Sequence, residues 1–224
     1  MVNSLTDFSN INIIETHGKD QPCAIPYPGD QMRVGTSTDL DRSIGFWARN
    51  SNGDLGIITA PHKNLLENTR IYIDGVWFGN AGQPYCNGSV DAVFIPRGAA
   101  HFEPTRYVPG FNFSHVSGSC SSIPVGGTSY SRGYVSDIQP GTVRDISYTA
   151  VMTSANPANS YTLNNCVVTS ASCQNHDSGG IVVGREHPTT PHVVGIIAGK
   201  QGGTDYVIYT KASYLLGTLN CTVY

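Results

Sequence analysis

His176-Asp-Ser-Gly-Gly-Ile-Val-Val183 joins a serine and two glycines to a short apolar run. The apolar run indicates a buried strand, and the polar residues before it indicate a tight turn. Two other stretches also place a polar residue at the end of an apolar strand: Thr59-Ala-Pro-His62 follows Leu55–Ile58, and Ser89-Val-Asp91 precedes Ala92–Ile95. Each stretch alone has an ordinary explanation, because histidine and aspartate are common in the loops that flank strands.

Short apolar stretches recur along the chain from Ser43 onward, and turn residues such as Asn50-Ser-Asn-Gly53 separate them. This pattern predicts many short strands. Only Lys211–Leu219 has helical spacing, with apolar residues at positions 212, 215, 216 and 219. The sequence therefore predicts an all-β chain with a short C-terminal helix, built as two barrels or as a sandwich.

The composition excludes several classes of protein. The 224 residues include 13 Lys and Arg and 16 Asp and Glu, and the charged share of 13% is about half the usual value. The sequence pI of about 6.1, without any cluster of basic residues, argues against a nucleic-acid partner. No apolar run is long enough to cross a membrane. The first 20 residues lack the regions of a signal peptide, so we expect either a cytosolic chain or a mature form.

The three polar stretches together carry the residues of a nucleophilic mechanism, in the order His62, Asp91, Ser178. A serine hydroxyl is a weak nucleophile and needs a base that titrates near neutral pH. A carboxylate fixes the tautomer of that base, and glycines after the serine let a substrate backbone come close. We therefore predict that Ser178 is a nucleophile, His62 its general base and Asp91 the orienting carboxylate.

These motifs resemble those of the chymotrypsin-like serine proteases. Thr59-Ala-Pro-His62 is similar to their histidine motif, and Asp177-Ser-Gly-Gly180 to their serine motif. Within the family, Ser43-Ile-Gly-Phe46 resembles the opening strand of the streptogrisin and alpha-lytic branch, without its cysteine. Tyr130-Ser-Arg-Gly133 resembles the Arg-Gly hairpin of that branch, and the tail from Tyr209 resembles its closing helix and strand.

The resemblance implies a secreted serine endopeptidase with two six-stranded antiparallel barrels that meet at a cleft. Residues 1–40 would be an N-terminal arm, residues 41–118 the first barrel and residues 119–224 the second. The substrate would be a protein or peptide. We expect a monomer with no nucleic-acid or membrane partner, and no metal or other cofactor, because no cluster of histidines and cysteines has the spacing of metal ligands.

The resemblance also assigns roles around the nucleophile. The backbone amides of His176 and Ser178 would form the oxyanion hole, and Arg132 would pair with Asp177 to fix the serine loop. His176 replaces the usual glycine and Pro61 a small residue, so a catalytically impaired homologue that acts as a binding protein is the alternative. A viral or intracellular processing protease on the same fold is a third possibility, which the cysteines and sequons disfavour.

The specificity pocket would be formed by two stretches of the second barrel. No acidic residue lies near Ser172 at its base, which argues against a preference for lysine or arginine. Lys200 at the rim could attract an acidic side chain, but an ordinary solvated lysine is the simpler reading. We expect cleavage after an apolar residue, with the pocket residues Ser172, Ile197, Ala198, Gly199 and Lys200.

Six dispersed cysteines and three Asn-x-Ser/Thr sequons, at Asn87, Asn112 and Asn220, indicate disulfides, glycosylation and an oxidising compartment. A cytosolic chain with buried thiols is the alternative. By resemblance to chymotrypsin, Cys23 would bond Cys120. The other four cysteines, Cys86, Cys166, Cys173 and Cys221, allow three pairings, and the sequence does not choose among them.

Overall fold

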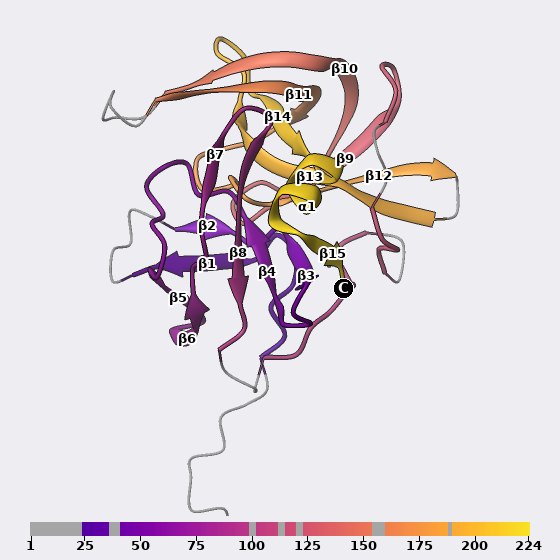
Figure 1. The fold of residues 1–224 in the computed structure, drawn as a ribbon. Helices are drawn as coiled ribbons and strands as arrows, with labels where there is room; N and C mark the ends of the chain where they lie inside the picture. The colour runs from indigo at the N-terminus through magenta and orange to yellow at the C-terminus, as the bar shows by residue number, and fades with distance from the viewer. Residues whose placement is uncertain are drawn as a thin grey trace, which may run out of the picture.

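The computed structural model describes residues 24–35, 41–98, 102–111, 115–119, 123–153, 160–187 and 190–224. These residues form fifteen strands and one helix, α1 (Ala212–Leu219) (Figure 1). The strands are β1 (Gln31–Val34), β2 (Arg42–Ser43), β3 (Phe46–Asn50), β4 (Leu55–Thr59), β5 (Arg70–Ile73), β6 (Val76–Asn80), β7 (Tyr85–Asn87), β8 (Val90–Pro96), β9 (Thr128–Gly133), β10 (Asp137–Met152), β11 (Tyr161–Ser172), β12 (Ile181–His187), β13 (Thr190–Lys200), β14 (Tyr206–Lys211) and β15 (Cys221–Val223). The expected all-β class is confirmed.

The second half of the chain contains a closed six-stranded barrel, in the order β10-β11-β14-β13-β12-β9, as predicted. Burial alternates along β9: Ser129, Ser131 and Gly133 are buried, whereas the residues between them are more exposed. One face of the strand therefore points into the barrel. All the pairings between neighbouring strands are antiparallel. This barrel carries the turn between β11 and β12, where Ser178 lies.

The first half contains two sheets, in the orders β2-β1-β5-β6 and β15-β3-β4-β8-β7. The strands expected for the first barrel are thus divided between them. Both sheets contribute to one core, in which Met32, Trp47, Ile57 and Phe78 are completely or almost completely buried. Trp47 and Phe78 meet edge to face with ring centres 5.7 Å apart. The two sheets therefore enclose a common interior.

The boundaries of the halves differ from the predicted division at both ends of the chain. Residues 31–34, predicted to belong to the arm, form β1, which pairs with β2 and β5. Met32 and Val34 are buried, which explains why this segment packs as a strand. The sequence did not reveal it, because four residues give too little periodicity to detect. At the other end, β15 leaves the second half and pairs with β3 in the first.

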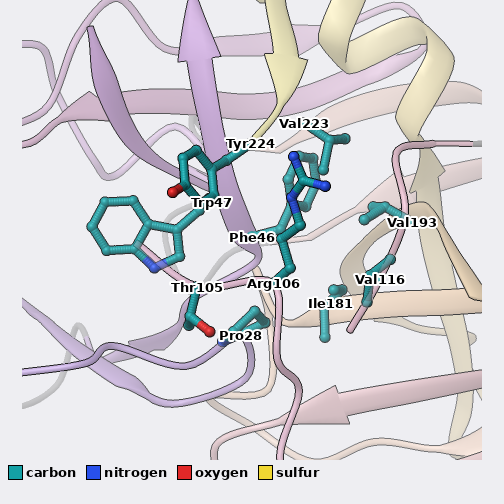
Figure 2. Close-up of a pocket in the computed structure, with 10 residues that line it drawn as sticks. All are labelled: Pro28, Phe46, Trp47, Thr105, Arg106, Val116, Ile181, Val193, Val223 and Tyr224. Carbon is teal, nitrogen blue, oxygen red and sulfur yellow. The ribbon is translucent and has the colours of Figure 1, made fainter. Parts of the chain in front are cut away.

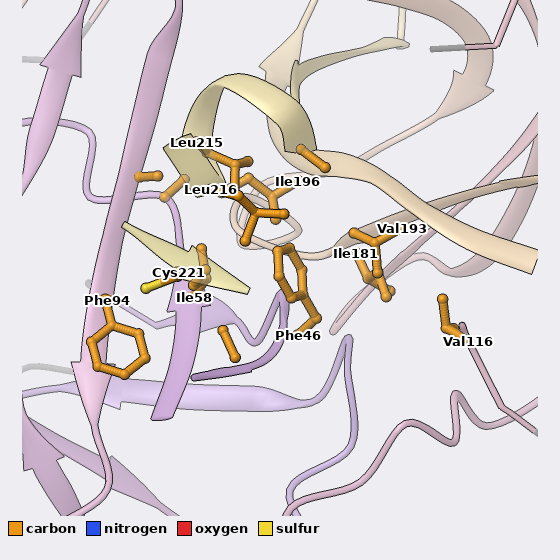
Figure 3. Packing of buried hydrophobic residues seen from close by; sticks show 14 of the residues in the cluster. Phe46, Ile58, Phe94, Val116, Ile181, Val193, Ile196, Leu215, Leu216 and Cys221 are labelled. Carbon is orange, nitrogen blue, oxygen red and sulfur yellow. The ribbon is translucent and has the colours of Figure 1, made fainter. Parts of the chain in front are cut away.

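A large apolar cluster joins the two halves (Figure 3). It contains Phe46 and Ile58 from the first half and Ile181 and Ile196 from the second, and α1 packs against it. The predicted helical spacing is confirmed, because residues 212, 215 and 216 of α1 are buried and residue 219 is partly buried. With eight residues α1 is short, and in the described part of the chain no helix is both long and apolar enough to span a membrane.

A very small cavity of about 10 Å³ lies beside this cluster, where the C-terminus meets both halves (Figure 2). Trp47 and Ile181 line it, together with Arg106, whose guanidinium lies 5.5 Å from the centre of the Tyr224 ring. This volume holds about one water molecule. The cavity is a packing feature of the interface and does not touch the predicted catalytic residues.

The prediction that most or all cysteines form disulfides is wrong for the four described ones. Cys86, Cys166, Cys173 and Cys221 are free, and all but Cys86 are buried. The three buried thiols belong to apolar clusters, where cysteine packs as a small apolar residue. Cys23 and Cys120, for which a bond was predicted, lie outside the described residues.

Candidate active site

His62 and Asp91 are in direct contact. His62 Nδ1 lies 2.5 Å from Asp91 Oδ2, and the His62 backbone amide donates to Asp91 Oδ1 at 3.1 Å. Asp91 is fully buried on β8, whereas the His62 side chain is 20% exposed. Burial alone would raise the pKa of Asp91, but the His62 ring and the hydrogen bonds from His62 and Tyr161 lower it below its usual range. The carboxylate is therefore charged and holds the ring with Nδ1–H directed at it.

The loop that carries His62 is an unusual turn. His62 has φ 51° and Lys63 φ 58°, a left-handed conformation that non-glycine residues seldom adopt. The carbonyl of Pro61 accepts hydrogen bonds from the amides of Asn64 and Leu65, which close the turn. Pro61 thus precedes a short turn with two left-handed residues. Such strain persists only where the surroundings hold the backbone.

The side chain of Arg42 holds the histidine loop by hydrogen bonds that the sequence did not predict. Its side chain is buried on β2 and donates to the carbonyls of Ala60 at 2.9 Å and Pro61 at 3.2 Å, and to Oδ1 of Asn64. Burial lowers the pKa of Arg42, and the Asp91 carboxylate partly opposes this effect. In the opening strand that Ser43–Phe46 resembles, a cysteine stands where this chain has Arg42. That replacement was the available signal that position 42 has a different role here.

Ser178 lies in the turn between β11 and β12, close to the end of β4. Gly179 makes this approach possible: it has φ 89°, and a Cβ there would lie 2.0 Å from Thr59 Oγ1. The carbonyl of Ser178 accepts a hydrogen bond from the amide of Ser43 at 3.0 Å. Ser178 and His62 line the same cleft, whose volume is about 390 Å³. The fold thus brings together the three predicted catalytic residues, two by direct contact and the third across this cleft.

His176 adopts the backbone conformation that its glycine-like position requires, with φ 76°. Two contacts hold it there: Ser43 Oγ donates to its carbonyl at 2.8 Å, and its ring Nδ1 lies 3.1 Å from the carbonyl oxygen of Asp41. Among the described residues, no acceptor takes a hydrogen bond from the amide of His176 or of Ser178. Among these residues, both amides are thus available as donors beside the Ser178 side chain.

The predicted pairing of Arg132 with Asp177 is wrong. The buried Asp177 carboxylate accepts three backbone hydrogen bonds, at 2.9 Å from Val135, at 3.0 Å from Ser136 and at 2.7 Å from Gln174. Amides of the β9–β10 turn and of Gln174, after β11, therefore satisfy the charge that a cation was expected to balance. Arg132 instead pairs with Asp30 at 3.0 Å and with the exposed Asp137 at 3.4 Å.

The predicted pocket residues are divided between three environments. Ala198, Gly199 and Lys200 line the cleft beside Ser178. Ser172 lines a neighbouring cavity of about 580 Å³, and Ile197 is buried in the barrel core. Sequence reasoning missed six other residues of the cleft, which come from the histidine loop, the β10–β11 hairpin and the serine loop: Asn64, Val151, Met152, Thr153, Tyr161 and Asn175.

Tyr161 makes the closest of these missed contacts. Its hydroxyl donates to Asp91 Oδ2 at 2.7 Å and lies 3.0 Å from His62 Nδ1. The tyrosine belongs to β11 in the second half, whereas both of its partners belong to the first. No local pattern signals such a contact, because 70 residues separate Tyr161 from Asp91.

No protein-family model matches the chain, and no curated protein matches it in sequence. Solved structures do match. Protease A of Thermobifida fusca has 20% identity and a TM-score of 0.70 over 89% of this chain and 98% of its own. A Nocardiopsis protease has 22% identity and a TM-score of 0.70 over 89% and 99%. A serine protease described as glutamic acid specific, with a histidine triad in substrate binding, has 21% identity and a TM-score of 0.69 over 90% and 100%.

These matches cover nearly the whole of each solved chain, and they include an alpha-lytic protease homologue with a TM-score of 0.67. At sequence identities of 15–22%, the similarity shows the fold, and the function depends on the particular side chains that the fold carries. The chain has the chymotrypsin-like fold of bacterial serine proteases.

Proposed function

We propose that the protein is a serine endopeptidase that cleaves peptide bonds through an acyl-enzyme. The observation that carries this proposal is the contact of His62 with the buried, charged Asp91, beside Ser178 in one cleft. An imidazole held by a carboxylate at Nδ1 presents Nε2 as a base. A serine within the same cleft is the group that such a base activates.

In the proposed reaction, Ser178 Oγ attacks the carbonyl carbon of the scissile bond while His62 Nε2 takes the hydroxyl proton. Asp91 remains ionised and stabilises the imidazolium that forms. The amides of His176 and Ser178 would donate to the oxyanion, and each such donor is worth roughly 10²–10³ in rate. His62 then returns the proton to the leaving amine. In the second half of the reaction, His62 takes a proton from a water molecule, which attacks the acyl carbon, and gives that proton to the departing Ser178 oxygen.

We propose an apolar residue before the scissile bond, as the sequence suggested. Apolar groups of Val151, Met152 and Ala198 line the cleft, and no acidic residue is among its lining residues. Lys200 is the cation at its rim, and its ammonium lies 3.4 Å from Asp205. Both side chains of this pair are exposed, so solvent screens the charge of Lys200. We therefore expect Lys200 to contribute little to the binding of an acidic side chain.

The alternative of a catalytically impaired homologue rested on strain at His176 and on Pro61. The contacts of His176 with Ser43 and Asp41 compensate the strain of the left-handed backbone. The turn after Pro61 leaves His62 in contact with Asp91. These contacts favour the active enzyme.

Labelling with a biotinylated diaryl phosphonate that carries an apolar side chain tests the proposal. We expect one phosphonate per chain at Ser178, no labelling of Ser178→Ala, and full labelling of Ser213→Ala, which changes an exposed serine of α1. A wild-type protein that folds normally but takes no label would contradict the proposal and would favour the binding protein.

Secretion is a further proposal, and it now rests on the sequons. Asn87 is exposed at the end of β7, where an oligosaccharyltransferase can reach it. The four free cysteines remove the argument from disulfides. Mass spectrometry of the protein from its natural source should find a glycan on Asn87, and an unmodified asparagine would leave the secreted location without support.

A further inference from the structure

The β10–β11 hairpin extends from the second barrel onto the first half of the chain (Figure 1). The amide of Asn164 donates to the carbonyl of Gly88 at 2.6 Å, and Asn165 Nδ2 donates to Ser89 Oγ at 3.1 Å. On the other side, Lys63 Nζ donates to the carbonyl of Ser160 at 3.2 Å. The first residues of β11 are therefore fixed to the loops on either side of the His62–Asp91 pair.

This attachment brings the Tyr161 hydroxyl to the oxygen that His62 also uses. Asp91 Oδ2 accepts from Tyr161 at 2.7 Å and lies 2.5 Å from His62 Nδ1. The ammonium of Lys63 lies 5.5 Å from the centre of the tyrosine ring, which further restricts the ring. Two donors thus share one carboxylate oxygen, and one of them comes from the opposite half of the chain.

The hydroxyl is a permanent donor. Burial raises the pKa of Tyr161 far above its usual value, and the Asp91 charge and hydrogen bond add to this effect. The phenol therefore remains protonated, and so a hydrogen-bond donor, in neutral and mildly alkaline solution. A hydrogen bond donated to a carboxylate withdraws part of its negative charge, so the carboxylate stabilises a neighbouring imidazolium less.

We propose that Tyr161 is a positioning residue for the His62–Asp91 pair: its hydroxyl shares the charge of Asp91 Oδ2, lowers the basicity of His62 and holds the imidazole in its plane. This inference rests on the proposed function for its catalytic meaning. It assigns to the hairpin a second role beyond lining the cleft, because the geometry of the pair in one half depends on a side chain from the other.

The other titratable groups around the pair do not change charge in the relevant range. Burial raises the pKa values of the thiols of Cys86 and Cys166 to about 12, so both are neutral near pH 7. Arg42 remains a cation, because an arginine side chain keeps its proton in proteins even where burial lowers its pKa. Removing the Tyr161 hydroxyl therefore isolates a single hydrogen bond among the groups that face Asp91 and His62, which are Arg42, Lys63, Cys86, Tyr161 and Cys166.

NMR titration of the His62 ring tests the proposal without requiring catalysis. The protein carries labelled histidine and the Ser178→Ala change, and the His62→Gln spectrum assigns the resonance. With Tyr161→Phe we expect the pKa of His62 to rise by about 0.5–1 unit, because the carboxylate recovers its charge. The matched control, Tyr148→Phe, changes a partly buried tyrosine of β10 and should shift that pKa by less than about 0.2 unit.

The rate of phosphonate labelling gives the catalytic readout in proteins that retain Ser178. The acid limb of the Tyr161→Phe profile should move to higher pH by the same amount, so labelling at pH 6 falls several-fold while labelling at pH 8 changes less. KM for an apolar peptide should remain within about twofold, since the aromatic ring stays in the cleft. A raised KM with an unchanged pH profile would mean that Tyr161 acts only on substrate binding, which overturns the proposal.

A second variant covers the case in which Tyr161→Phe fails to fold. Incorporation of 3-fluorotyrosine at position 161 makes the phenol a stronger donor and should lower the pKa of His62. An unchanged His62 pKa in both variants, or shifts with the opposite signs, would overturn the proposal. If the wild-type protein takes no phosphonate, the proposed peptidase fails separately, and the NMR titration still decides whether Tyr161 controls the pair.

Discussion

Replacement of Arg42 by methionine is the perturbation whose effect follows most directly from the contacts around the histidine loop. Methionine keeps much of the buried chain length but donates no hydrogen bond. The carbonyls of Ala60 and Pro61 and the amide oxygen of Asn64 would lose their donor. Asp91 would also lose the cation that opposes its burial.

The magnitude follows from two opposing terms. Breaking a buried charged group away from its partners costs about 3–5 kcal/mol when the partners stay buried. Removing the guanidinium also relieves its own desolvation, and Arg42 Nε has no hydrogen-bond partner among the described residues. We therefore expect the free energy of unfolding to fall by about 2–3 kcal/mol. For a chain of this length the corresponding fall in Tm is about 4–12 °C.

Denaturant unfolding and peptide hydrolysis measure the two consequences. We expect kcat to fall by about 10–100-fold with KM nearly unchanged, because the loop positions His62 rather than the substrate. Arg42→Lys should recover part of both losses. Arg49→Met is the matched control: Arg49 is exposed, and within the described residues its side chain donates only to the carbonyl of Gly53, so its loss should change stability by less than about 0.5 kcal/mol. An Arg42→Met enzyme with wild-type stability and kcat would refute the reasoning.

Four further predictions test the surroundings of the site. Gly179→Ala places a Cβ 2.0 Å from Thr59 Oγ1 at φ 89°, so activity should fall by at least about 10²-fold in a peptide assay; normal activity would show that the serine loop can move away. Asp177→Ala leaves three amides without their acceptor and should reduce kcat strongly, whereas Arg132→Met should reduce it by less than about tenfold; the reverse order would restore the ion-pair model. Because the folded pKa of Asp91 is lowered, its contribution to the unfolding free energy is present above its unfolded pKa of about 4 and is lost as the pH falls; Asp91→Asn should flatten that acid dependence, and an unchanged slope would contradict the lowered pKa. Finally, the described thiols should react slowly with a thiol reagent at pH 8 and fast after unfolding, since burial raises their pKa values to about 11 or 12; fast reaction in the native state would contradict their burial.

The parts of the fold that the sequence predicted are those with strong local signals. The spacing of α1 identified a helix whose apolar face is buried, and short apolar stretches separated by turn residues identified the strands of the closed barrel. β1 was missed because four residues with two buried side chains resemble a loop. The crossing of β15 to pair with β3 depends on tertiary packing and has no local signature.

The candidate site was predictable where a motif fixed the residue type and was missed where a distant chain segment supplied the contact. His62, Asp91 and Ser178 were found from three short stretches that the fold then brings together. The Arg132 prediction failed because backbone amides can balance a carboxylate, and the sequence does not reveal which amides are unpaired. Tyr161 was missed because 70 residues separate it from Asp91, so no local pattern signals the contact.

Hydrolysis of an apolar peptide by the wild-type protein and by Ser178→Ala, measured side by side, is the most direct test of the central claim that Ser178 is the nucleophile. We expect cleavage by the wild-type protein and a loss of about 10⁵-fold or more in kcat for the variant, with the circular dichroism of the two proteins unchanged. Equal rates of cleavage by the two proteins would contradict the account.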